Sequence, residues 1–158
     1  MILVDQRLND AMSVLKIRHW IACSPQDVWE ANTTPEKFCQ FFAPEGLSIP
    51  LESVVLEVRV GGRFECDMVF DETGVVNENK GILTAVEEPN LLVGEERSIG
   101  FRSTQRFLSD SGGTLISIDQ EGLPAELATD PEVHEAFRSS YRKLGRLLGV
   151  ETENRPCE

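Results

Sequence analysis

The longest stretch of the sequence with a single pattern runs from Val54 to Leu123, where apolar and polar residues alternate. A period of two is typical of β-strands that place one face in a core and the other face in solvent. Turn signals interrupt the alternation at short intervals, at Gly61-Gly62, Thr73-Gly74, Glu88-Pro89, Gly100 and Gly112-Gly113. Because short turns connect antiparallel neighbours, the stretch predicts six consecutive strands in a meander.

The residues before this stretch predict one more strand and two short helices. Residues 15–22 alternate and contain β-branched and aromatic types, which favours a strand. Ser24-Pro25 and Thr34-Pro35 each combine an N-cap residue with a proline at the first helical position. They predict helices that run to about Asn32 and to about Phe41.

The residues after the stretch predict one long amphipathic helix. Asp130-Pro131 supplies its N-cap and first residue, and Gly149 is a suitable stop. Its apolar residues recur every three or four positions and so share one face: Val133, Phe137, Tyr141, Leu144 and Leu148.

This order of elements predicts an α+β fold. We expect a curved antiparallel sheet of about seven strands, two short helices after the first strand, and a long C-terminal helix across the concave face. A curved sheet and a single helix touch only along a line, so a space tends to remain between them, and this space suggests a ligand cavity. We expect one domain over residues 13–149, an N-terminal extension over 1–12 and a frayed C-terminal tail over 150–158.

The charge of the chain restricts its partners. The net charge of -12 and the pI near 4.6 oppose binding to polyanions, because phosphate contacts need clustered Lys and Arg. We therefore expect no nucleic-acid partner. No run approaches the roughly 18 apolar residues of a membrane-spanning helix, so no membrane insertion is expected. Met1–Asp10 lacks the pattern of a secretory signal, which favours a cytoplasmic location.

The sequence contains none of the usual catalytic or metal-binding motifs. Its four cysteines are widely spaced, without a Cys-x-x-Cys pair, which argues against a zinc site and against a disulfide framework. The only histidines, His19 and His134, do not lie in a metalloprotease, hydrolase or P-loop motif. We expect no metal, no cofactor and no catalytic residue. Gly61-Gly62 between Arg59 and Arg63 is better explained as a strand turn than as an anion site.

An ordered set of short motifs covers nearly everything from Met12 to Leu148. The motifs are Ala22-Cys-Ser-Pro-Gln-Asp-Val-Trp-Glu-Ala31, Thr34-Pro-Glu-Lys37, Phe41-Phe-Ala-Pro44, Arg59-Val-Gly-Gly-Arg-Phe64, the Gly113-Thr114 strand that ends in Gln120-Glu-Gly122, and the His134 to Leu148 helix. Together they resemble the bacterial relatives of the heat shock protein 90 ATPase activator, an Aha-type family of the START-like SRPBCC superfamily. The resemblance implies a helix-grip fold with an internal cavity.

The resemblance implies the fold more strongly than any one function. The superfamily spans lipid binders, hormone receptors, aromatase-cyclases and co-chaperone domains. The chain also departs from the family pattern at positions near the expected cavity. Asn32 stands where relatives usually have a large apolar residue, Phe41 stands where tryptophan is usual, and Phe137 stands where tryptophan is common. The identity of a ligand is therefore not transferred from relatives.

The turns suggest which residues face one another across the last strands. A turn at Gly112-Gly113 places Phe107 opposite Ile118, and a turn at Gly100-Phe101 places Glu95 opposite Arg106. Arg106 then lies between Glu95 and Asp119 on the solvent face, as opposite charges favour.

The same pairing puts three polar residues, Glu96, Gln105 and Gln120, in one row on the inner face. Because an unpartnered buried polar group costs roughly 1–3 kcal/mol, such a row needs an explanation. Two remain open. The row lies at the hydrated rim of the sheet, or it forms the polar end of a cavity and orients a hydroxyl, amide or amine of a ligand.

We expect the protein to bind a small apolar or amphipathic molecule. The candidate ligand contacts are Asn32, Phe41, Phe64, Met68, Glu96, Gln105, Phe107, Ile118, Gln120, Phe137 and Tyr141. The alternatives are a polyketide cyclase-like or dehydratase-like enzyme that uses Glu96 with Tyr141 or His134, and a co-chaperone-like protein-interaction domain. The sequence also leaves a homodimer open.

Overall fold

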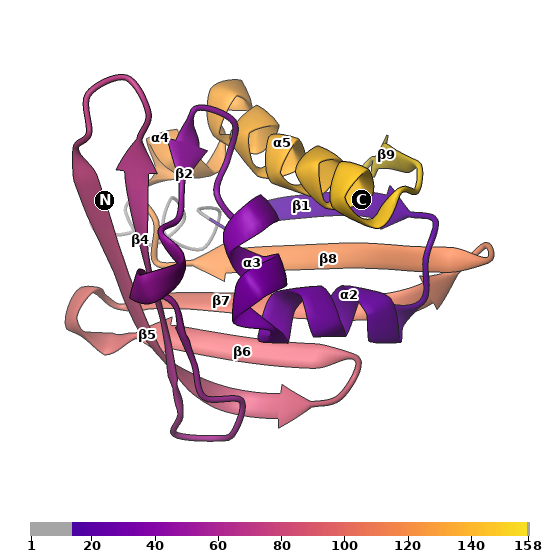
Figure 1. The fold of residues 1–158 in the computed structure, drawn as a ribbon, viewed down its shortest axis with the longest axis horizontal. Helices are drawn as coiled ribbons and strands as arrows, with labels where there is room; N and C mark the ends of the chain where they lie inside the picture. The colour runs from indigo at the N-terminus through magenta and orange to yellow at the C-terminus, as the bar shows by residue number, and fades with distance from the viewer. Residues whose placement is uncertain (1–13, 158) are drawn as a thin grey trace, which may run out of the picture.

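The computed structural model describes residues 14–157, and its main element is a nine-stranded antiparallel sheet (Figure 1). Neighbouring strands follow the order β2-β4-β5-β6-β7-β8-β1-β9, and β3 pairs with β4. The strands are β1 (Leu15–Ile21), β2 (Leu47–Ser48), β3 (Val55–Leu56), β4 (Arg63–Phe70), β5 (Val76–Glu87), β6 (Leu91–Glu96), β7 (Phe101–Asp110), β8 (Gly113–Glu121) and β9 (Thr152–Arg155).

The helices are α2 (Pro25–Thr33), α3 (Pro35–Phe41), α4 (Ala125–Ala128) and α5 (Pro131–Leu148), with 3-10 turns η1 (Leu51–Ser53) and η2 (Arg97–Ile99). The caps explain the bounds of two of them. The Ser24 hydroxyl accepts a hydrogen bond from the backbone N–H of Asp27 at 3.1 Å and starts α2. Asp130 starts α5 in the same way, and Gly149 ends it in the left-handed conformation.

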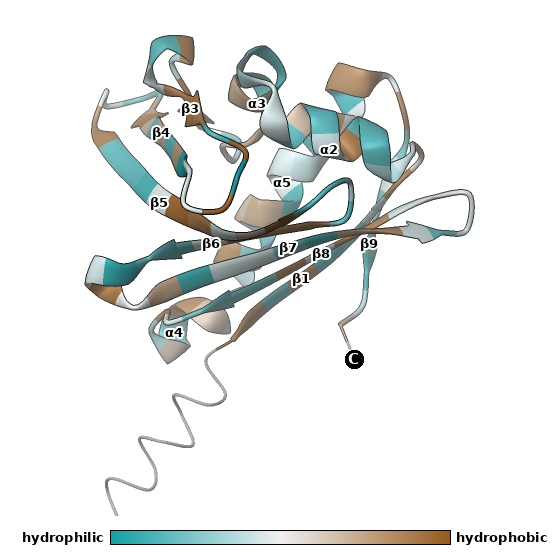
Figure 2. Cartoon of the chain, turned by 90° about the horizontal axis from the view of Figure 1, so that it is seen from below, coloured by the Kyte–Doolittle hydropathy of each residue, from teal (hydrophilic) through white to brown (hydrophobic). Residues whose placement is uncertain are grey.

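The main core lies between the concave face of the sheet and α2, α3 and α5, which all cover that face (Figure 2). Its buried members are Leu15, Ile17, Ile21, Val28, Trp29, Ala31, Phe41, Leu83, Leu92, Phe107, Ile116, Ile118, Ala128, Tyr141 and Leu144. A second, smaller core lies where α3 and the segment after it cover β4, and it contains Phe38, Ala43, Ile49 and Cys66. The predicted fold class is therefore confirmed, with more strands than the seven expected.

Hydrogen bonds hold α5 against the loop that follows α3. The Nζ atom of Lys143 donates to the backbone carbonyl of Ala43 at 2.9 Å and to that of Pro44 at 3.1 Å. One turn earlier, the hydroxyl of Ser140 donates to the carbonyl of Phe42 at 3.2 Å. These bonds satisfy carbonyls at the end of α3, where no helical partner exists. They also fix where α5 crosses the sheet.

The turn between β7 and β8 is formed by Ser111-Gly112, so the predicted turn at Gly112-Gly113 is wrong. Asp110 faces Gly113, and both turn residues have positive φ, 50° at Ser111 and 79° at Gly112. Gly113 belongs to β8 for a different reason: a Cβ at that position would lie 2.4 Å from the carbonyl oxygen of Ile21. Phe107 therefore faces Ile116 rather than Ile118.

The connection between β6 and β7 also differs from the prediction. A tight turn at Gly100-Phe101 was expected, but η2 and Gly100 form a four-residue connection, and Gly100 takes the left-handed conformation. Glu95 therefore faces Arg102, not Arg106. Both errors shift the register by an even number of residues. Because side chains alternate between faces, each residue keeps the face that was predicted for it.

The end of the chain forms an edge strand, so the expectation of a frayed tail after residue 150 is wrong. β9 pairs with β1 and places Arg155 opposite Arg18. Arg155 bonds to Asp110 at 3.2 Å and lies over the ring of Trp20, 5.5 Å from its centroid. The predicted N-terminal extension, residues 1–12, lies outside the described residues.

Candidate functional site

The concave face of the sheet has a closed half and an open half. In the closed half, Phe107 faces Ile116, and Gln105 faces Ile118; all four are buried. The next inward-facing residues toward η2 are only half-buried and define the open half: Gly94, Glu96, Phe101, Ser103 and Gln120. The inner surface of the sheet therefore remains partly accessible to solvent at this end.

Four polar side chains form a diagonal band that starts in the open half. The polar band consists of Glu96 on β6, Ser103 and Gln105 on β7, and Gln120 on β8. Ser103 faces Gln120, whose Nε2 atom lies 3.5 Å from the Ser103 hydroxyl oxygen. Glu96 faces Phe101. It is thus a diagonal neighbour of Ser103, and Gln105 is a diagonal neighbour of Gln120.

The predicted single row of Glu96, Gln105 and Gln120 is therefore wrong, because it depended on the two incorrect turns. The corrected register spreads these residues over three successive rows and adds Ser103, which the sequence analysis missed. Alternation already puts Ser103 on the inner face, but its position beside Gln120 could have been found only from the true turn between β7 and β8. The faces were predicted correctly, so all four side chains still point to the inner side of the sheet.

Three candidate contacts with apolar side chains are half-buried and pack against the two cores. Phe64 and Met68 on β4 are inward-facing and half-buried, as is Gly94, which leaves the centre of β6 without a side chain. Phe137 contributes from α5, is also half-buried, and packs against the main core. The open half itself combines the aromatic ring of Phe101 with a few hydrogen-bonding groups, the mixture found in sites for amphipathic ligands.

Four of the candidate ligand contacts belong to the packed core: Phe41, Phe107, Ile118 and Tyr141. Phe41, Phe107 and Ile118 are buried, and Phe107 makes an edge-to-face contact with Trp29 at a centroid distance of 6.4 Å. Asn32, which replaces an apolar residue of the relatives, is buried as well. Its Nδ2 atom donates to the carbonyl of Val28 at 2.9 Å, and its Oδ1 atom has no hydrogen-bond partner among the described residues.

Tyr141 lies in the closed half, where it stacks on His19. The ring centroids are 5.7 Å apart, and both side chains are buried. Neither ring nitrogen of His19 has a hydrogen-bond partner among residues 14–157. Burial lowers the pKa of His19 to about 4, with a smaller opposing effect from Asn154. Burial also raises the pKa of Tyr141. His19 was not a sequence candidate; its place among the alternating residues of β1 was the available signal.

The described residues do not bring the proposed catalytic groups together. Glu96 lies in the same row across the sheet as Phe101. His19, which stacks on Tyr141, lies in the same row as Phe107. These rows are six residues apart on β7, about 20 Å at roughly 3.3 Å per residue. In addition, the Nε2 atom of His134 lies 2.9 Å from the carbonyl oxygen of Ala128 and is engaged there.

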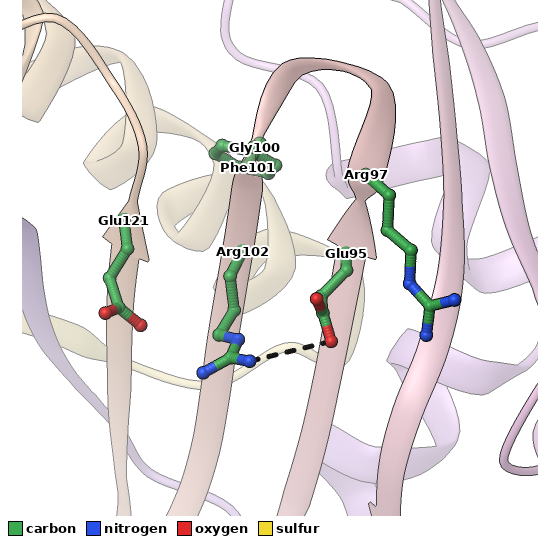
Figure 3. A pocket seen from close by; sticks show the side chains of 6 residues that line it. All are labelled: Glu95, Arg97, Gly100, Phe101, Arg102 and Glu121. Atoms are coloured by element: carbon green, nitrogen blue, oxygen red, sulfur yellow. Dashed lines mark ion pairs between the residues drawn. The ribbon is translucent and has the colours of Figure 1, made fainter.

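The two pockets that stand out in the structure lie away from the interface of α5 with the sheet. One, with a volume of about 290 Å³, is on the convex side beside η2 (Figure 3). It is lined by Glu95, Arg97, Gly100, Phe101, Arg102 and Glu121. The other, about 370 Å³, is lined by Arg18, Leu115, Arg155 and Pro156. Beneath α5, where the sequence predicted a cavity, Tyr141 and Leu144 are buried in the main core.

Arg102 occupies the place between two acids that the sequence analysis gave to Arg106. It faces Glu95 on one side and Glu121 on the other, and its Nη2 atom lies 3.7 Å from Glu95 (Figure 3). Asp119, the other acid that was predicted beside Arg106, forms an ion pair with Arg18 on β1 instead. These charges neutralise one another on an exposed surface and form no binding site with an excess of either charge.

Within residues 14–157, no three side chains of His, Cys, Asp or Glu are grouped to hold a metal ion. No helix of this region combines the length and the apolar character that crossing a membrane requires. Burial raises the pKa of the Cys66 thiol to about 12, and the thiol belongs to the second core. It is therefore not poised for nucleophilic chemistry.

A curved antiparallel sheet with two short helices after β1 and a long C-terminal helix on the concave face defines a helix-grip protein. The sequence pattern of the family described as Activator of Hsp90 ATPase homolog 1-like protein matches residues 22–149. The chain belongs to this family, within the SRPBCC superfamily.

Solved structures show the same fold. A protein from Nitrosomonas europaea superposes with a TM-score of 0.78 at 22% identity, over 89% of this chain and 96% of its own. An AHSA1-like protein from Aeromonas hydrophila gives 0.72 at 20% identity, over 86% and 94%. The AHSA1 protein from Silicibacter pomeroyi gives 0.64 at 24% identity, over 86% and 97%. A search of curated proteins found no match.

Proposed function

We propose that this protein binds a small amphipathic molecule on the open half of the concave face. The observation that supports the proposal is that inward-facing residues at this end of the sheet remain partly accessible, although the neighbouring rows around Gln105 and Phe107 on the same face are buried. A monomeric fold normally buries the inner face of its sheet. A stretch that is left accessible, and that is lined by both aromatic and polar groups, is suited to a guest molecule.

The polar band indicates which chemistry the guest carries. Ser103, Gln105 and Gln120 each supply both a donor and an acceptor, and Glu96 is the single charged member of the band. No Lys or Arg belongs to the open half as defined above, so the band offers no countercharge for an anion. We therefore expect a ligand with a hydroxyl, amide or amine group beside an apolar body that packs on Phe137 and Phe64.

The experiment is a thermal-shift screen of small amphipathic molecules, with the fluorescent amine 1-aminoanthracene as the first probe. A ligand of the native state raises the melting temperature by mass action. The affinity of each hit is then measured for the Q105L/Q120L double variant. Loss of the polar contacts predicts an affinity at least about tenfold weaker.

The matched control is R106A, on the exposed opposite face of the same strand, which should leave the affinity unchanged. Each variant is checked for an unaltered far-UV circular dichroism spectrum before binding is compared. Equal affinity in Q105L/Q120L and in the wild type would rule out the polar band as the recognition element. A screen without any stabilising molecule of this class would rule out the function itself.

A further inference from the structure

Glu96 is the only Asp, Glu, Lys or Arg on the concave face of β1 and β4–β8 in the described part of the chain. Every other charged residue of these strands is on the convex face, as the register shows for Glu95, which faces Arg102, and for Asp119, which faces Lys16. A single negative charge therefore marks an inner face whose other polar groups are neutral.

The carboxylate of Glu96 has no partner among residues 14–157. The side chain is half-buried, yet it forms no hydrogen bond and no ion pair with these residues. The carboxylate of the next residue along β6, Glu95, lies 3.7 Å from Arg102 on the convex face. The two neighbouring acids thus differ in that only Glu95 has a countercharge.

The basic residues of α5 that approach the sheet are engaged away from Glu96. The Nζ atom of Lys143 donates to the loop after α3, and Arg142 pairs with Glu135 at 2.6 Å. Arg138 lies near His19, whose pKa is lowered by burial and also by the charges of Arg142 and Arg138. These residues therefore belong to the closed half, and the helix supplies no countercharge to Glu96.

The residues around Glu96 leave its carboxylate uncovered. On β5 it is flanked by Gly81, where a Cβ would lie 3.5 Å from the carbonyl oxygens of Glu95 and Phe64. The preceding inward-facing residue on β6 is Gly94, and on β7 Glu96 faces the aromatic ring of Phe101. A guest on the open half would therefore contact the carboxylate and the ring together.

Any guest that covers this end of the sheet removes water from Glu96. Covering an unpaired carboxylate is strongly unfavourable unless the guest supplies a partner for its charge. A neutral guest supplies at most a hydrogen bond, and an anion would repel the carboxylate. A bare divalent metal ion needs about six oxygen ligands. Among residues 14–157 no three His, Cys, Asp or Glu side chains are grouped to hold one.

We infer that the guest is an organic cation, with an ammonium group held by Glu96 and an apolar body that packs on Phe101. The inference rests on the proposed function and narrows it to one class of ligand. A hydrogen bond between ammonium and carboxylate is about twice as strong as a neutral one, and an ammonium beside an aromatic ring is attracted to its face. The Ser103 hydroxyl and the Gln120 amide oxygen are further acceptors for N–H groups. The net charge of -12 also attracts cations to the protein.

Two probes with the same apolar body test the inference. Binding of naphthylethylamine, a cation at neutral pH, is compared with binding of naphthylethanol by isothermal titration calorimetry. The amine should bind the wild type at least about tenfold more tightly than the alcohol. E96Q keeps the size of the side chain but removes its charge, so it should reduce the amine to the affinity of the alcohol. E96K should reverse the preference and favour the anion naphthylpropionate over the amine.

The matched control is E95Q, which removes the adjacent carboxylate on the convex face and should leave the preference for the amine unchanged. Glu96 makes no bond within the described fold, so E96Q should keep the circular dichroism spectrum of the wild type. If neither probe binds the wild type, the proposed function is overturned, and this inference with it. Equal affinities for the two probes, or a preference for the amine that E96Q retains, would overturn the cation assignment and leave the proposed function standing.

Discussion

The imidazole of His19 stacks on the ring of Tyr141, with 5.7 Å between the centroids, and joins β1 to α5 through a buried polar pair. Neither nitrogen of His19 has a partner in the described part of the chain. The ring must therefore be neutral in the folded protein, because a buried, unpaired imidazolium would be strongly destabilising. This contact makes the stability of the fold depend on pH.

The first prediction concerns stability at acidic pH. The pKa of His19 is lowered from 6.5 to about 4 by burial, so between these values the unfolded chain binds a proton that the folded chain does not. The free energy of unfolding therefore falls as the pH drops through this range. His19 alone should account for about 2 kcal/mol between pH 7.5 and pH 5.

The measurement is urea denaturation of the wild type and of H19F at both pH values. H19F should lose about 2 kcal/mol less than the wild type on acidification, because phenylalanine does not titrate. K16M, at an exposed position on the same strand, is the control, and it should lose as much as the wild type. The same loss in all three proteins would mean that His19 is not the group responsible.

The second prediction concerns the attachment of α5 to the loop after α3. K143M keeps the apolar stem of the side chain but removes the ammonium that donates to the carbonyls of Ala43 and Pro44. Leaving these acceptors without a charged donor should lower the free energy of unfolding by about 1–3 kcal/mol. Urea denaturation measures the loss. K16M, at an exposed position on β1, should change stability by less than about 0.5 kcal/mol.

The order of the elements and the face of each strand residue were predictable from the sequence. Both depend on local signals: Ser24-Pro25 and Asp130-Pro131 start helices at the observed positions, and alternation alone puts Phe107 and Gln105 on the inner face. The register was not predictable in this way. It depends on which glycine occupies a turn, and the sequence does not distinguish a turn glycine from one that is required by close packing.

The candidate site shows the same limit. Glu96, Gln105 and Gln120 were correctly placed on the concave face, but their arrangement as a diagonal band required the true register. The contact of His19 with Tyr141 joins residues more than 100 positions apart, and no local pattern reports such a contact. The expected cavity beneath α5 was inferred from the shape of the backbone alone. Which side chains lie in this space can be seen only once the helix is packed on the sheet.

The third prediction tests why Gly113 is a glycine. In G113A the added Cβ would lie 2.4 Å from the carbonyl oxygen of Ile21 and 2.7 Å from the ring of Trp20. Neighbouring backbone must shift to accept it, which should cost about 3 kcal/mol. G94A is the control, because a Cβ there meets nothing closer than 3.9 Å. If G113A were as stable as G94A in thermal denaturation, Gly113 would not be required by packing.

The last prediction concerns β9, which covers the edge of β1 beside His19. Truncation after Val150 removes the pairing of His19 with Asn154 and the contacts of Arg155 with Asp110 and Trp20. The edge of β1 then becomes free, and solvent gains access to the imidazole. We expect the free energy of unfolding at pH 7.5 to fall by about 1–3 kcal/mol, measured by urea denaturation.

The truncated chain should also lose less stability than the full chain between pH 7.5 and pH 5, because a hydrated His19 titrates closer to its ordinary pKa. R155A separates the two effects. It removes the ion pair and the contact with Trp20 but keeps the backbone pairing that covers β1, so it should lower stability without changing the dependence on pH. An unchanged dependence on pH in the truncated chain would show that β9 does not shield His19.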